Sequence, residues 1–214
     1  MKKIILYFIF MISIFVLSNN ESLASCPSGF TKDTVTIFAG NCSYYVEICF
    51  KCDVTNPGQV KINKIWLVDT TCYNSLNIEL VIGQIYSEIS TGSFIYSNLC
   101  PNALYPTPPC NETGTSYNQF EIIHNYCWQQ YYRHNGVGPI REYIACDDNA
   151  VCIETIDYCF DATSMEIIVI RRNNSSSQSP PCDLIWNEVT WPTVLGTKSD
   201  CFILNSVPCG IVFE

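Results

Sequence analysis

Apolar and polar residues alternate most regularly between Thr34 and Cys52, and this alternation predicts a β-hairpin. A period of two residues is typical of strands that bury one face. Gly40-Asn41, in the middle of the stretch, supplies the positive φ angles that a two-residue hairpin turn needs. A turn of this length also sets the register of the strands. It predicts three directly opposed pairs, which place the apolar residues on one face: Ala39 with Cys42, Ile37 with Tyr44, and Val35 with Val46.

A third strand is predicted over Gln59–Asp69, after the turn Asn56-Pro57-Gly58. Its apolar alternation changes phase at Asn63-Lys64, which indicates one inserted residue, that is, a β-bulge. The first three strands are therefore expected to form an antiparallel meander. The next segment, Asn74–Thr91, has apolar residues at helical spacing, although Gly83 and many β-branched residues lower its intrinsic helix propensity. We expect one helix, over about 74–91, that packing stabilises.

The segment Ser97–Ser116 has four prolines between two cysteines, which predicts a loop. Alternation then returns and predicts further strands over residues 117–133, 140–146, 153–160 and 165–171. If the strands on either side of the loop 146–152 pair directly, Cys146 and Cys152 face each other within disulfide distance. The sequence thus predicts a mainly β fold of antiparallel meanders and hairpins with one packed helix, rich in disulfides.

The N-terminus has the features of an export signal. Lys2 and Lys3 precede the uncharged apolar run Ile4–Leu17, and Ser22-Leu23-Ala24 offers small residues for cleavage. The apolar run is shorter than the roughly 20 residues that span a bilayer. We therefore expect a signal peptide over residues 1–24, no membrane span in the mature chain, and an extracytoplasmic location, secreted or at the cell surface.

An alternative is a surface lipoprotein anchored at Cys26, because Leu23-Ala24-Ser25-Cys26 resembles the lipobox of bacterial lipoproteins. Two features favour simple cleavage after Ala24. Five polar residues, Ser18 to Ser22, separate the apolar run from the box. In addition, lipidation of Cys26 would leave an odd number of cysteines for pairing.

All 14 cysteines follow the predicted signal, and an even number at this density indicates structural disulfides formed in an oxidising compartment. Cys146–Cys152 is the best single predicted pair. Cys49-Phe-Lys-Cys52 is a CxxC motif, but no helix follows it to lower a thiol pKa. The predicted disulfide cysteines are Cys26, Cys42, Cys49, Cys52, Cys72, Cys100, Cys110, Cys127, Cys146, Cys152, Cys159, Cys182, Cys201 and Cys209.

The domain organisation follows from composition. Residues 25–172 are expected to form the disulfide-linked β-rich domain, and the polar segment 173–181, NNSSSQSPP, a flexible linker. The tail, residues 182–214, contains three cysteines. Because three cannot pair among themselves, at least one is expected to hold the tail against the domain.

Few residues suggest catalysis or cofactor binding. A formal net charge of −9 makes nucleic acid an unfavourable partner. His124 is the one candidate general base, and a hydrolase that used it or a carboxylate pair is the enzymatic alternative. No Gly-x-Ser-x-Gly, His-Glu-x-x-His or phosphate-loop motif is present. Asp147, Asp148 and Asn149 are candidate calcium ligands, although turn formation also explains them, so no metal or cofactor is expected.

Aromatic residues are the candidate binding residues: Tyr45, Tyr131, Trp66 and Trp128. On a strand face they could stack against a cell-surface protein or a glycan, although core packing accounts for most such residues. Because catalytic motifs are missing from an oxidised β scaffold, the preferred prediction is a non-catalytic extracytoplasmic binding or structural module.

Overall fold

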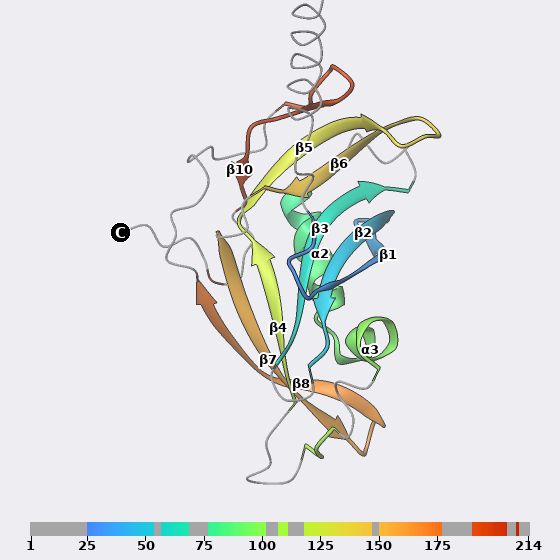
Figure 1. Cartoon of the computed structure of the whole chain (residues 1–214). Coiled ribbons are helices and arrows are strands. Elements are labelled where there is room, and N and C mark those ends of the chain that lie inside the picture. The colour runs from blue at the N-terminus through green and yellow to red at the C-terminus, as the bar shows by residue number, and fades with distance from the viewer. Residues whose placement is uncertain are drawn as a thin grey trace, which may run out of the picture.

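The protein is described by a computed structural model that covers residues 25–53, 57–68, 77–101, 107–110, 118–146, 150–176, 190–204 and 209. In this part of the chain, ten strands form one mostly antiparallel sheet (Figure 1). The strands are β1 (Thr31–Ala39), β2 (Cys42–Lys51), β3 (Gly58–Leu67), β4 (Asn118–Asn125), β5 (Cys127–His134), β6 (Pro139–Ala145), β7 (Val151–Asp161), β8 (Glu166–Ser176), β9 (Thr197–Lys198) and β10 (Phe202–Ile203).

The opening meander is confirmed. β1 and β2 pair in the predicted register, from Ala39 opposite Cys42 to Val35 opposite Val46 and beyond. Asn41 has the positive φ, 68°, that the turn requires. In the β2–β3 pair, Glu47 lies opposite Lys64 and Ile48 opposite Ile62, so the residue between them in β3 is the predicted bulge.

The centre of the sheet departs from a simple meander because β3 pairs with β4 in parallel. The stretch predicted as one strand, 117–133, is divided at Tyr126 into β4 and β5, whose partners are different. The Tyr126 amide donates to the Ala150 carbonyl, and the Trp128 indole donates to the Asn125 carbonyl, so both sides of the break are hydrogen-bonded. In Figure 1, β5 and β6 form one end of the sheet and β7 and β8 the other.

The predicted helix is confirmed as α2 (Ile78–Ile89), and the Asn77 side chain caps its N-terminus by accepting from the Glu79 amide. Its apolar residues are buried: Ile78, Val81, Ile82, Ile85, Tyr86 and Ile89. They pack with residues of β2, β3, β4 and β7 in one hydrophobic core. We call the face of the sheet that contacts α2 the inner face and the opposite face the outer face. Helical structure continues through α3 (Gly92–Phe94) and η2 (Ile95–Leu99), so the predicted loop begins later than Ser97.

All described cysteines are disulfide-bonded. The Cys146–Cys152 prediction is wrong, because β6 and β7 are not neighbours: β3 and β4 lie between them in the sheet. Each of these two cysteines bonds to the tail instead. The bonds with both partners described are Cys26–Cys49, Cys52–Cys100, Cys110–Cys159, Cys146–Cys201 and Cys152–Cys209.

The segment predicted as a flexible linker, residues 173–181, begins as part of a strand. Residues Asn173 to Ser176 belong to β8 and pair with β7, so the first part of the segment 173–181 is strand. Its remaining residues lie outside the described ranges. Beyond them, β9 and β10 add to β5, and Cys201 and Cys209 are bonded to the β-rich body. The described part of the tail is therefore integrated into the sheet.

Candidate functional site

Three of the four predicted aromatic binding residues lie in one row across the outer face. Directly opposed pairs connect Tyr45 on β2 with Trp66 on β3, Trp66 with Glu142 on β6, and Glu142 with Tyr131 on β5. Directly opposed residues of a sheet project from the same face. The Tyr45 and Trp66 rings contact each other, with centroids 5.6 Å apart. Alternation in separate strands thus gathers these side chains into one surface.

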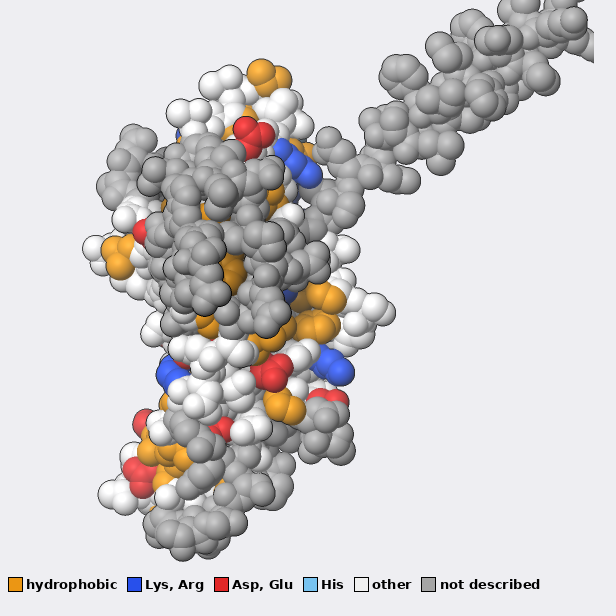
Figure 2. Space-filling model, turned by 90° about the vertical axis from the view of Figure 1, so that its left-hand side faces the viewer, with side chains coloured by type: hydrophobic (Ala, Val, Ile, Leu, Met, Phe, Trp, Pro, Cys, Tyr) orange, Lys and Arg blue, Asp and Glu red, His pale blue; other side chains and the backbone are white. Residues whose placement is uncertain are grey.

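The exposed end of this row is extended by two further apolar residues. Phe38 lies opposite Ser43 on the β1–β2 hairpin, and the Val68 amide donates to the Ser43 carbonyl from the end of β3. Phe38 is 77% exposed, Val68 42% and Tyr45 38%, while Trp66 is partly exposed. We call these four residues, Phe38, Tyr45, Trp66 and Val68, the outer patch. Elsewhere, for example on the side shown in Figure 2, hydrophobic side chains reach the surface in small groups among polar and charged ones.

The other end of the row is closed. Glu142 is fully buried, and one of its carboxylate oxygens accepts from Arg133 Nε at 2.7 Å. The Lys198 ammonium lies over the Tyr131 ring, 5.5 Å from its centroid. Trp128 is completely buried in the core. Of the predicted binding residues, Tyr45 and Trp66 therefore belong to the accessible surface, Tyr131 is partly exposed beside the Lys198 ammonium, and Trp128 is structural.

His124 takes part in a buried polar cluster between the sheet and α2. Its Nε2 lies 3.0 Å from Glu154 Oε2, and the Tyr86 ring stacks on the imidazole at 4.0 Å between centroids. Arg172 donates to the other Glu154 oxygen at 2.6 Å and to the Ser90 hydroxyl at 3.2 Å. The cluster thus joins β4, β7, β8 and the end of α2.

This geometry assigns His124 a structural role. The imidazole is only 4% exposed, and both oxygens of its carboxylate partner are occupied by hydrogen bonds. The Ser90 hydroxyl of the cluster is itself buried and donates to the Ser87 carbonyl, and the Tyr86 hydroxyl donates to the Ile123 carbonyl. A general base needs access to a substrate proton. No such access exists at His124, so its position gives no support to the hydrolase alternative.

Burial lowers the pKa of His124 below its ordinary value of 6.5, although the Glu154 carboxylate acts in the opposite direction. Burial alone would raise the pKa of Glu154, but hydrogen bonds from His124 and Arg172 leave it below its ordinary 4.5. In both cases the unfolded chain binds protons that the folded protein does not. Each of the two groups therefore stabilises the folded protein fully at pH values above the pKa that it has in the unfolded chain. This stabilisation is lost as pH falls toward the pKa that the group has in the folded protein.

We expect the free energy of unfolding to decrease as pH falls below 6.5, with a slope of at most about 1.4 kcal/mol per pH unit from His124. Urea titrations at several pH values measure this slope. His124→Gln should flatten it, and His134→Gln, at an exposed position, is the control for the loss of one histidine. Equal slopes in the wild-type protein and His124→Gln would contradict this account.

The remaining predicted sites have different outcomes. Cys26 is bonded to Cys49, and because a lipid anchor would need the same sulfur, this bond favours simple cleavage over the lipoprotein alternative. The two cysteines of the CxxC motif, Cys49 and Cys52, have separate partners and form no redox pair.

The candidate calcium ligands Asp147, Asp148 and Asn149 lie outside the described ranges. Within those ranges, His, Cys, Asp and Glu side chains form no group of three suited to a metal ion.

The fold and site define a disulfide-rich, mainly antiparallel β protein with an exposed apolar patch on one sheet face. No protein-family model matches the chain, and neither a curated protein nor a solved structure shows significant similarity to it. In the described part of the chain, no helix has the length and apolar character needed to cross a membrane.

Proposed function

We propose that the protein is an exported, non-catalytic binding module that uses the outer patch to hold a partner protein. The observation that carries the proposal is the grouping of four apolar side chains, all at least partly exposed, on the outer face of the sheet. Contiguous exposed apolar groups mark interaction surfaces in soluble proteins. Export is supported by the signal-like N-terminus and by disulfide bonding of every described cysteine.

A protein is the favoured partner, for two reasons. Phe38 and Val68 offer no hydrogen-bonding groups, which a glycan would need for its hydroxyls, whereas apolar side chains of a protein would pack against them. In addition, β1 pairs only with β2 among the described strands. Its other edge borders two hollows, lined in part by Phe38, Glu88 and Gln84. An unpaired strand edge beside an apolar patch suits a polypeptide, which can supply both main-chain hydrogen bonds and apolar side chains.

The test compares two exposed surfaces of the same protein. The variant Phe38→Ser/Tyr45→Ser removes half of the outer patch, and Val137→Ser removes a 95% exposed apolar side chain from the β5–β6 turn. Each is used, with the wild-type protein, to capture partners from the surface and medium of the producing cells under non-reducing conditions. We expect a protein captured by the wild-type protein and by Val137→Ser to be lost, by at least about tenfold, with the patch variant.

Hydrogen–deuterium exchange of the complex locates the contact independently. Slower exchange of the β1 and β3 amides in the complex would support the proposal. Equal capture by both variants, or a glycan that binds with unchanged affinity to the patch variant, would overturn it.

A further inference from the structure

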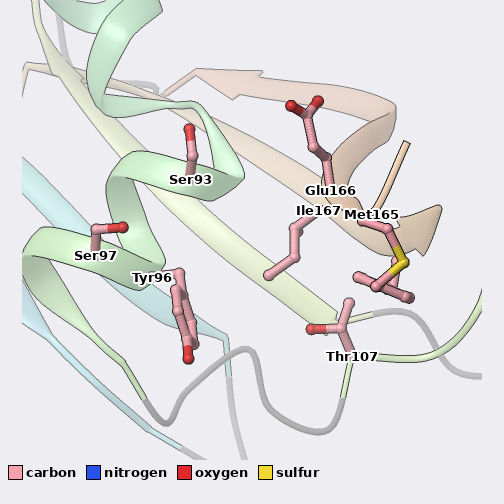
Figure 3. Close-up of a pocket in the computed structure, with 8 residues that line it drawn as sticks. Ser93, Tyr96, Ser97, Thr107, Met165, Glu166 and Ile167 are labelled. Carbon is pink, nitrogen blue, oxygen red and sulfur yellow. The ribbon is translucent and has the colours of Figure 1, made fainter. Parts of the chain in front are cut away.

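A second site, distant from the outer patch in the chain, lies between the short helical segment and the β7–β8 hairpin (Figure 3). It is a pocket of about 480 Å³. Ser93, Tyr96 and Ser97 of α3–η2 form one wall, and residues at the start of β8 form the other (Figure 3). The lining residues are Ser93, Tyr96, Ser97, Thr107, Phe160, Met165, Glu166 and Ile167.

The helical wall is held firmly against β8. The Thr91 hydroxyl accepts from the Phe94 amide and caps α3. Gly92 packs directly on Ile167: a Cβ at this position would lie 2.6 Å from Ile167 Cγ2 and 2.9 Å from its carbonyl oxygen. Only glycine permits this approach. The distance between α3 and β8 is therefore determined by backbone contact.

The segment that carries Thr107 is fixed in a similar way. The Phe160 amide donates to the Pro108 carbonyl at 2.8 Å, and the Cys110 amide donates to the Phe160 carbonyl at 3.0 Å. The Cys110–Cys159 disulfide adds a covalent link between the same two segments. Ligand sites are generally preformed cavities of this kind, with apolar walls and a few polar groups.

The chemistry of the lining selects among ligands. Tyr96, Met165 and Ile167 provide an apolar surface, and Glu166 is the only charged side chain among the described lining residues. In Figure 3, the Glu166 carboxylate and the Ser93 hydroxyl lie toward one end of the pocket, whereas Thr107 lies toward the other. The described lining has a carboxylate and no cationic side chain, and the protein has a net charge of −9, so the described part of the pocket disfavours anions.

We propose that this pocket binds a small organic cation, an amine or quaternary ammonium with an apolar body. The ammonium would lie beside the Glu166 carboxylate and the Ser93 hydroxyl. The apolar body would lie between Tyr96 and Ile167. This inference uses none of the outer-patch residues and is independent of the proposed partner binding.

The test uses three probes of similar shape and different charge: 2-phenylethylamine, 2-phenylethanol and phenylacetate. Isothermal titration calorimetry at pH 7 should show the protonated amine binding at least about tenfold more tightly than the alcohol, and the anion not binding measurably. Glu166→Gln should remove the preference for the amine. Asp200→Asn, which makes the same change of net charge at an exposed remote site, should preserve it.

Glu166 is exposed, so its replacement is expected to leave the fold intact. Equal affinities for amine and alcohol, an undiminished preference in Glu166→Gln, or no binding of the amine would each overturn the inference. Capture of a partner protein through the outer patch should be the same in Glu166→Gln and in the wild-type protein, so failure of this inference is distinguishable from failure of the proposed function.

Discussion

Replacing both Cys52 and Cys100 by alanine is expected to lower the free energy of unfolding by about 3 kcal/mol. Their disulfide closes a loop with a sequence separation of 48 residues, and Cys100 is 1% exposed. For an isolated loop of this length, chain entropy alone gives about 4 kcal/mol. The other cross-links shorten the effective loop and reduce this value. Urea denaturation of the oxidised protein measures the loss.

The Cys52–Cys100 bond also joins the end of β2 to the end of η2, and so holds the helical layer against the sheet. The matched control is the double alanine variant of Cys26 and Cys49, whose bond has a separation of only 23 residues and links the segment preceding β1 to β2. We expect this variant to lose less stability, because the entropy of the unfolded chain depends on loop length. A loss in the control that equalled or exceeded the first would contradict the loop-length argument.

The opening hairpin could be predicted from the sequence because its determinants are local. Gly40-Asn41 adopts positive φ at both positions, and a two-residue turn leaves a single register for the strands. The bulge in β3 could be predicted for the same reason, since the phase change at Asn63 is visible in the alternation itself. The α2 helix was found from periodicity despite Gly83, around which a side chain would have open space.

The order of strands in the sheet could not be predicted in this way. Alternation reports that a segment is a strand but does not say which strand it pairs with. The Cys146–Cys152 prediction assumed that neighbours in sequence are neighbours in the sheet. The parallel β3–β4 pair separates β6 from β7 and sends each cysteine to a different part of the tail. The break at Tyr126 carries no glycine or proline and continues the alternation, so it has no local signal.

Among the candidate sites, too, features set by local alternation could be predicted, whereas those set by strand pairing could not. Tyr45 was placed on the outward face because alternation decides orientation, and the same rule applied to Phe38, two residues after Thr36, would have added it to the patch. The partners of His124 depend on a second bulge. A register shift between Asp157 and Tyr158 in the β7–β8 pair sets Arg172 opposite Ile156, on the inner face beside Glu154. The pocket between α3–η2 and the β7–β8 hairpin is formed by residues far apart in sequence, so it could be found only from the three-dimensional structure.

Arg133→Ala is expected to destabilise the protein by about 3 kcal/mol, because it leaves the Glu142 carboxylate buried without its ion-pair partner. Glu142 is fully buried, and its second oxygen has no hydrogen-bond partner among the described residues. Breaking a fully buried pair typically costs about 3–5 kcal/mol. The lower value is expected here, since the Arg133 side chain is 29% exposed and water can reach the site once it is removed.

Two further variants test whether the loss of stability in Arg133→Ala comes from the unpaired carboxylate of Glu142. Arg141→Ala removes a neighbouring arginine that stacks on Tyr132 and Trp191, and should cost only about 1 kcal/mol. Replacing Glu142 by leucine together with Arg133→Ala should recover most of the loss, because an apolar side chain needs no counter-charge. If Arg133→Ala and Arg141→Ala were equally mild, the buried ion pair would have no special part in stability. Since Glu142 lies directly opposite Trp66, recovery in the double variant would also show that an apolar side chain at position 142 can support the sheet beside the outer patch.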